Sequence, residues 1–94
     1  MKKVRFHPQA KAEMQESVRF YEARFEGLGF RFLSAVEQTS ERISAHPEAG
    51  TPLKTGFRKR IVPGFPYNVI YCVCGKITSI SSLLPTNIDV LAIG

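Results

Sequence analysis

The stretch RKRIVPGFPYNVIY, residues 58–71, contains three consecutive cations, two prolines and two tyrosines. Polar and apolar positions alternate in FRKRIV, residues 57–62, which indicates a strand with Arg58 and Arg60 on one face. The connection PGFP is too rigid, and too poor in N–H donors, for a central strand. YNVIYCVC, residues 67–74, follows with the strongest strand propensity in the chain. This stretch therefore predicts two strands joined by a stiff turn.

Upstream of this stretch, a strand and two helices are expected. KKVRFH, residues 2–7, alternates as a half-buried strand does, and Pro8 suits the first turn of a helix. Apolar residues then recur at helical spacing in a first stripe of Met14, Val18, Tyr21 and Phe25. After the break GLG, residues 27–29, a second stripe comprises Leu28, Phe32, Ala35, Val36, Thr39 and Ile43. Two helices of about 18 residues joined by a short glycine turn are expected to be antiparallel neighbours.

Downstream, ITSISSLL, residues 77–84, reads as a further strand, and IDVLAIG, residues 88–94, as another apolar segment. The predicted fold class is therefore α+β. It consists of an N-terminal strand, an antiparallel αα-hairpin and then three to four mainly antiparallel strands, with the helices packed on one face of the sheet. We expect residues 1–94 to form a single domain, because 94 residues suffice for one core and not for two.

The chain is basic, with 13 Lys and Arg against 8 Asp and Glu, a net charge of +5 and a pI near 9.6. Such a surplus favours polyanionic or acidic partners, whether RNA, DNA or an acidic protein. The N-terminal cations are not followed by the apolar region of a signal peptide. No apolar run approaches the length of about 20 residues that spans a membrane. We therefore expect no membrane association and a cytoplasmic location.

No metal or cofactor site is expected. Cys72 and Cys74 are two residues apart in a predicted strand, where bridging geometry is poor, so buried free thiols are expected. A zinc site that recruits His7 and His46 to this pair lacks the usual ligand spacing, and both histidines are expected to be structural or exposed. The glutamates of the first helix are expected on its solvated face: Glu13, Glu16, Glu22 and Glu26.

The order of these segments resembles the RelE/ParE superfamily of type II toxin–antitoxin toxins, often labelled plasmid stabilisation proteins. The matching pieces are FHPQAKAEMQESVRFYEAR, LGFRFLSAVEQTSERISAHPEAG and GFRKRIVPGFPYNVIY, and they cover about Val4 to Val73. The positions that the family repeats in the last piece are Arg58, Phe65, Pro66, Tyr67 and Tyr71. The resemblance implies a RelE/ParE-like fold, no cofactor and a cognate antitoxin as protein partner.

The resemblance also implies one of two activities: mRNA cleavage on the ribosome, as in RelE, or inhibition of DNA gyrase, as in ParE. A metal-independent nuclease needs a base, an acid and cations that stabilise the phosphate in the transition state. The candidate cations are Arg58, Arg60 and Lys54. However, Asn68 occupies a position where the nuclease pattern has arginine, and no Lys or Arg follows Lys76.

These departures favour the ParE-like alternative, in which the protein binds a target such as gyrase and is not an enzyme. The expected target-contact residues are Arg58, Lys59, Arg60, Tyr67 and Tyr71. For the cations, protection of an edge strand against aggregation is the alternative role. For the tyrosines, which share a strand face because they are four residues apart, the alternative is core packing. The nuclease is the second functional alternative, and an inactive antitoxin-binding relative with a degenerate C-terminus is the third.

The antitoxin implied by the resemblance wraps its toxin with an amphipathic helix and an added strand. Such a partner needs apolar surface beside the helical hairpin or at the sheet edge. We therefore expect exposed apolar patches there.

Overall fold

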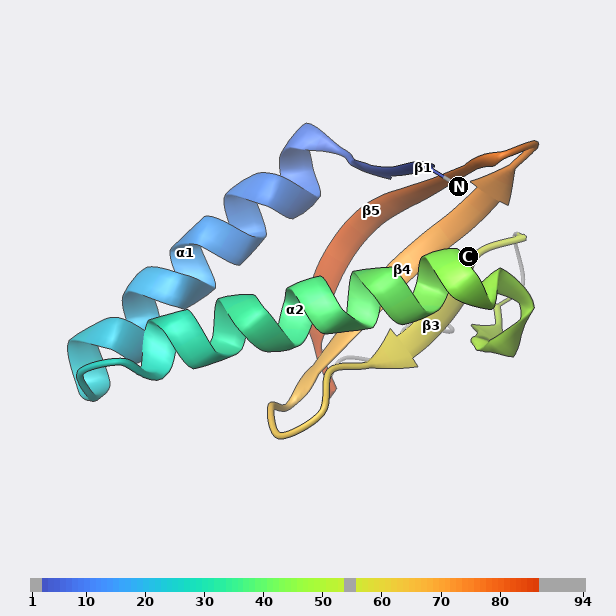
Figure 1. Ribbon diagram of the computed structural model, residues 1–94. Coiled ribbons are helices and arrows are strands. Elements are labelled where there is room, and N and C mark those ends of the chain that lie inside the picture. The colour runs from blue at the N-terminus through green and yellow to red at the C-terminus, as the bar shows by residue number, and fades with distance from the viewer. Residues whose placement is uncertain (1–2, 54–55, 87–94) are drawn as a thin grey trace.

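The computed structural model describes residues 3–53 and 56–86. A five-stranded sheet, in the order β1-β5-β4-β3-β2, carries both long helices on one face (Figure 1). The elements in chain order are β1 (Lys3–Phe6), α1 (Pro8–Arg24), α2 (Leu28–Ala45), the 3₁₀ turn η1 (Pro47–Ala49), β2 (Thr51–Pro52), β3 (Arg58–Ile61), β4 (Tyr67–Cys74) and β5 (Ile77–Pro85). The predicted α+β class is confirmed. The segment IDVLAIG lies outside the described residues.

The sheet is built around β4, which pairs antiparallel with β3 on one side and β5 on the other. A bulge between Ile70 and Tyr71 shifts the register against β5, and bulges of this kind increase strand twist. β1 pairs with β5 in parallel, with Lys3 opposite Ile77 and Phe6 opposite Ile80. The N-terminal strand is therefore added to the sheet beside the last described strand.

α1 starts at Pro8, as expected, with His7 as its N-cap. The Nδ1 atom of His7 accepts a 3.1 Å hydrogen bond from the Gln9 backbone N–H, which satisfies one of the free donors at the helix start. The helix ends one residue before Phe25, which is its C-cap and is 68% exposed. Placing Phe25 in the apolar stripe was therefore wrong, because the backbone is already extended at this residue.

The turn between the helices depends on Gly27 and Glu22. Gly27 has φ = +87°, a conformation that side chains with a Cβ rarely adopt. The Glu22 carboxylate accepts hydrogen bonds of 3.0 Å from the backbone N–H groups of Gly27 and Gly29. It therefore caps the start of α2 from the preceding helix. Assigning Glu22 only to a solvated face missed this contact.

The core lies between α2 and the central strands. Phe32, Val36 and Ile43 of α2 are fully buried, as their spacing predicts. They belong to one cluster with Val69 of β4 and Ile80 of β5. Burial of these side chains is the main driving force that holds the helical hairpin on the sheet.

Candidate functional site

Arg58, the first residue of β3, is bonded to the chain itself. Its Nη1 atom donates to the carbonyl oxygens of Gly50 at 2.7 Å and Glu48 at 3.1 Å. Hydrogen bonds from a charged donor are stronger than neutral ones. Arg58 therefore ties the segment around η1 to the sheet, and its guanidinium is already engaged.

Tyr71 holds the same segment from β4. The residue is fully buried; its hydroxyl donates to the Pro47 carbonyl at 2.7 Å and accepts from the Gly50 N–H at 3.1 Å. Arg58 and Tyr71 are directly opposite each other in the sheet, so both side chains lie on the face that carries the helices. Tyr71 thus has no surface for contact with a target, and its expected role in target binding is not supported by its position.

Arg60 lies opposite Val69, on the same face of the sheet as Arg58. It is half-buried, and its Nη1 atom is buried without a hydrogen-bond partner. The side chain lines a cleft of about 460 Å³ with the C-terminal part of α2. Of the two arginines of β3, Arg60 is the one with a buried nitrogen that has no hydrogen-bond partner in the described structure.

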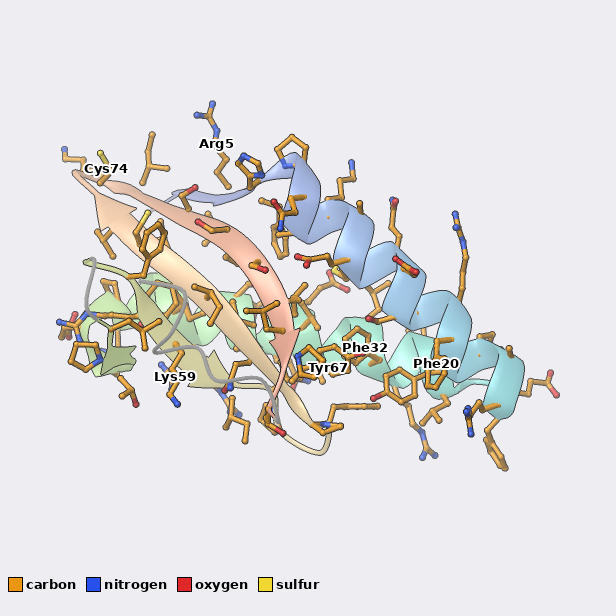
Figure 2. The ribbon with its side chains drawn as sticks, turned by 180° about the vertical axis from the view of Figure 1, so that it is seen from behind. Arg5, Phe20, Phe32, Lys59, Tyr67 and Cys74 are labelled. Carbon is orange, nitrogen blue, oxygen red and sulfur yellow. The ribbon has the colours of Figure 1, made fainter. Side chains whose placement is uncertain are left out.

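Lys59 projects to the other face of the sheet, because side chains alternate along β3. It is half-buried and lies between Thr51 of β2 and Ile70 of β4. Figure 2 shows it on the side of the molecule away from Phe20 at the hairpin end. The three consecutive cations therefore do not form one patch. Lys54, the remaining candidate cation, lies outside the described residues.

Tyr67 belongs to an aromatic cluster that joins the helices to the turn between β3 and β4. Its ring centroid is 5.2 Å from that of Phe32 and 6.3 Å from that of Tyr21, and Phe65 contacts Tyr21 and Phe32 at 5.1 Å (Figure 2). The Tyr67 hydroxyl accepts from Ser17 Oγ at 3.2 Å. Burial, and to a lesser degree Tyr67, raises the pKa of Tyr21. The FPY motif is thus chiefly a packing motif.

Asn68 is buried, at 8% exposure, and lies opposite Ile61 of β3 and Leu84 of β5. Its neighbour Val69 faces the helices with Arg60, so Asn68 faces away from them. The position where the nuclease pattern has arginine is therefore on the other side of the sheet from Arg58 and Arg60.

The cysteines of β4 are free, with Cys72 half-buried and Cys74 exposed. The expectation that both thiols are buried was wrong, because Cys72 is only half-buried and Cys74, the last residue of β4, is exposed (Figure 2). Within the described ranges, no group of three or more His, Cys, Asp or Glu side chains is arranged to hold a metal ion.

The end of the helical hairpin exposes three large aromatic side chains. Phe20, Phe25 and Phe30 are 51%, 68% and 71% exposed. The Arg24 guanidinium lies 4.6 Å from the centre of the Phe20 ring, a cation–π contact. Phe20 and Phe30 both lie outside the predicted apolar stripes. A large apolar residue outside the stripe of its helix is expected to be exposed, and this is the signal in the sequence that could have identified them. We call these three residues the hairpin aromatic surface.

A groove of about 890 Å³ separates α2 from β1. Val4 and Phe6 of β1 supply apolar surface, and Glu37 and Glu41 of α2 supply negative charge. Among the described strands, β1 pairs only with β5, so its other edge is open to a further strand. Neither α1 nor α2, nor any other helix in the described part of the chain, is long and apolar enough to cross a membrane.

A helical hairpin on a mixed five-stranded sheet, with Arg58 and Arg60 on β3, defines the class as a RelE/ParE-like α+β domain. The family model described as the ParE toxin of the type II toxin–antitoxin system parDE matches residues 4–90, and the chain belongs to this family. Among solved structures, one described as a chromosomal ParDE TA system from P. aeruginosa is similar. It has a TM-score of 0.68 and 22% identity, over 90% of this chain and 96% of that one. This similarity shows a shared fold. Comparison with curated proteins gave no match.

Proposed function

We propose that this ParE-family chain inhibits bacterial growth by binding DNA gyrase in the cytoplasm, and that a cognate antitoxin neutralises it. Family membership over residues 4–90 supports the toxin class. The observation that carries the choice of binding over catalysis is the bonding of Arg58. Its Nη1 atom donates to the carbonyl oxygens of Gly50 at 2.7 Å and Glu48 at 3.1 Å, which holds the side chain against the segment around η1 and uses both hydrogens of that nitrogen.

The second candidate function is mRNA cleavage on the ribosome, and the unpartnered nitrogen of Arg60 favours it. A single arginine supplies one of the cations that a metal-independent nuclease needs, but neither its base nor its acid. Asn68 lies on the opposite sheet face and adds no charge. We therefore rank cleavage below target binding.

The contact with the target is assigned to the accessible side chains of the expected set. Arg60 and Lys59 are half-buried on opposite faces of β3, Arg60 lines the cleft beside α2, and Tyr67 lines a shallow hollow beside α1. Arg58 and Tyr71 act from inside the protein, since both fix the segment next to β3, the strand that carries Arg60 and Lys59. We thus propose that Arg60, Lys59 and Tyr67 contact the target. Arg58 and Tyr71 have a positioning role.

The antitoxin is proposed to cover the hairpin aromatic surface and the open edge of β1. Exposed aromatic rings at one end of a helix pair are a docking surface for an amphipathic helix. An added strand along β1 can place apolar side chains on Val4 and Phe6 in the neighbouring groove. Both features match the expectation of apolar surface beside the hairpin and at the sheet edge.

The activity is tested with the purified chain in a gyrase supercoiling assay and, in parallel, by primer extension on mRNA during translation. We expect loss of supercoiling and intact mRNA. Cleavage at codons that disappears in the Arg60→Ala variant would instead establish the nuclease. Normal growth on induced expression, with unaffected supercoiling, would identify the inactive antitoxin-binding relative.

The antitoxin partner is tested by co-expression with the product of the adjacent reading frame. We expect a stable complex and restored growth. A chain that remains monomeric beside that product, with growth still inhibited, contradicts the proposed neutralisation and leaves the gyrase result unaffected.

A further inference from the structure

The cleft between the end of α2 and β3 has a lining that is unusually rich in hydrogen-bond donors. Gln38, Arg42 and the C-cap His46 follow one another at intervals of four residues, so they lie along one side of the helix. Arg60 faces them from β3, and Glu41 and Ala45 complete the lining of this 460 Å³ space. Residues that bear two guanidinium groups, an imidazole and an amide therefore line one hollow.

The fold itself leaves Arg60 incompletely bonded. Its Nη1 atom is buried and has no acceptor in the described structure. A buried donor on a charged group without an acceptor costs about 1–3 kcal/mol or more. The carbonyl end of α2, which carries partial negative charge, offsets part of that cost. It supplies no hydrogen bond to Nη1, so this nitrogen has no acceptor in the described structure, and because the atom is buried an acceptor from outside reaches it only when the side chain moves toward the cleft.

We propose that this cleft binds a carboxylate side chain presented by an acidic segment of a partner protein. A carboxylate pairs with a guanidinium through two parallel hydrogen bonds, which gives both energy and orientation. Arg60 makes this pair, Arg42 adds a second positive charge, and the Gln38 amide bonds the backbone of the segment. The inference rests on the proposed function in one respect, since the segment belongs to a protein that the toxin binds.

The charge of the surroundings favours a carboxylate over a nucleic-acid strand. Glu41 lies in the cleft lining, and both Glu37 and Glu41 line the adjacent groove beside β1. A strand with a phosphate at every nucleotide would run past these carboxylates, and like charges repel. One acidic side chain reaches Arg60 and Arg42 without this repulsion.

The test is an NMR titration of the full ¹⁵N-labelled chain with a short synthetic peptide, capped at both ends, that carries a single glutamate among glycines. We expect saturable shifts at Gln38, Arg42, His46 and Arg60. The Arg60→Gln variant is expected to weaken binding about tenfold or more, as loss of a charged pair does. Since Arg60 is half-buried, the exposed Arg42→Gln variant provides a second test that does not depend on folding. It is expected to weaken binding about twofold to fivefold, because it removes one exposed charge.

The matched control is Arg31→Gln, which removes one positive charge from an exposed position at the other end of α2. We expect it to leave peptide binding unchanged. An equal loss in this variant, or peptide shifts spread over the whole surface, overturns the proposal, because both mean general attraction to a basic protein. Tighter binding of a hexathymidine oligonucleotide than of the peptide overturns the carboxylate assignment.

Binding and function fail separately in this design. If the wild-type chain inhibits gyrase and binds no peptide in the cleft, the inference is overturned and the proposed function stands. If the peptide binds in the cleft and gyrase is unaffected, the proposed function is overturned and the carboxylate site stands.

Discussion

The hydroxyl of Tyr71 donates a 2.7 Å hydrogen bond to the carbonyl of Pro47, a residue 24 positions earlier in the chain. The same oxygen accepts from Gly50 N–H, and a Cβ atom added at Gly50 would overlap it. This buried pair of bonds joins the segment that follows α2 to the centre of the sheet. The close approach at Gly50 leaves no space there for a side chain.

Removal of this hydroxyl is therefore costly. We expect Tyr71→Phe to lower the free energy of unfolding by about 1–3 kcal/mol, because the Pro47 carbonyl and Gly50 N–H both lose a buried partner. Urea denaturation measures the change. The control is Tyr67→Phe, whose hydroxyl is only part-buried and accepts one bond. Equal losses in the two variants would contradict a special role for Tyr71.

Substitution of Arg58 is expected to lower stability, whereas substitution of the neighbouring Lys59 is not. Arg58→Gln loses two bonds from a charged donor to backbone carbonyls, and we expect a loss of about 1.5–3 kcal/mol of stability. Lys59→Gln removes the same charge from the neighbouring residue and is expected to change stability by less than about 0.5 kcal/mol. Thermal unfolding of both variants checks this. A stable Arg58→Gln variant would return Arg58 to the list of free cations.

Glu22 is expected to stabilise the hairpin turn. We expect Glu22→Ala to lower the free energy of unfolding by about 0.5–2 kcal/mol, the range for loss of an N-terminal cap, because the N–H groups of Gly27 and Gly29 lose their acceptor. The matched control is Glu26→Ala at an exposed position next to the same turn, which we expect to have little effect. Chemical denaturation of the two variants decides between capping and general charge effects.

Alkaline pH is expected to weaken the aromatic cluster. The pKa of Tyr21 is raised above 10.0, first by burial and then by Tyr67. A raised pKa means that the folded state prefers the neutral phenol, so its contribution is complete below pH 10 and is lost as the pH rises through the folded pKa. Tyr21→Phe removes this titration. Melting temperatures of both proteins at pH 9 and pH 11 are expected to show the smaller decrease in the variant.

The hairpin aromatic surface is expected to contribute to binding and not to stability. Phe25→Ala and Phe30→Ala together are expected to weaken antitoxin binding about tenfold or more, as loss of aromatic contacts in an interface does. Stability is expected to change little, since both rings are more than two-thirds exposed. Val73→Ala, at an exposed apolar position at the far end of β4, is the control. Calorimetric titration of the purified pair measures the affinities.

Periodic burial made most of the fold predictable. Phe32, Val36 and Ile43 recur at helical spacing, and all three are fully buried. Phe25 continued the first stripe by the same spacing, yet the helix ends before it. A hydrophobic period locates a face of a helix, but it does not determine where the backbone leaves the helical conformation.

Contacts between a side chain and a distant backbone group could not be predicted from spacing. Glu13 was assigned to the solvated face of α1, but its Oε1 accepts from Ser82 Oγ at 3.0 Å and Leu83 N–H at 3.2 Å on β5. The carbonyls that hold Arg58 are likewise eight and ten residues away. Such pairs follow from tertiary geometry alone, so the sequence indicated the charges of the candidate site without indicating which of them are already bonded.

The parallel pairing of β1 with β5 has a consequence for the timing of synthesis. Val4 lies opposite Thr78 and Phe6 opposite Ile80. More than seventy further residues must therefore be synthesised before β1 can pair with β5. Contacts of such long sequence separation close late in folding. The sheet that carries Arg58 and Arg60 is thus completed only after β5 has been synthesised, which gives an antitoxin already present in the cell the opportunity to meet the toxin as it folds.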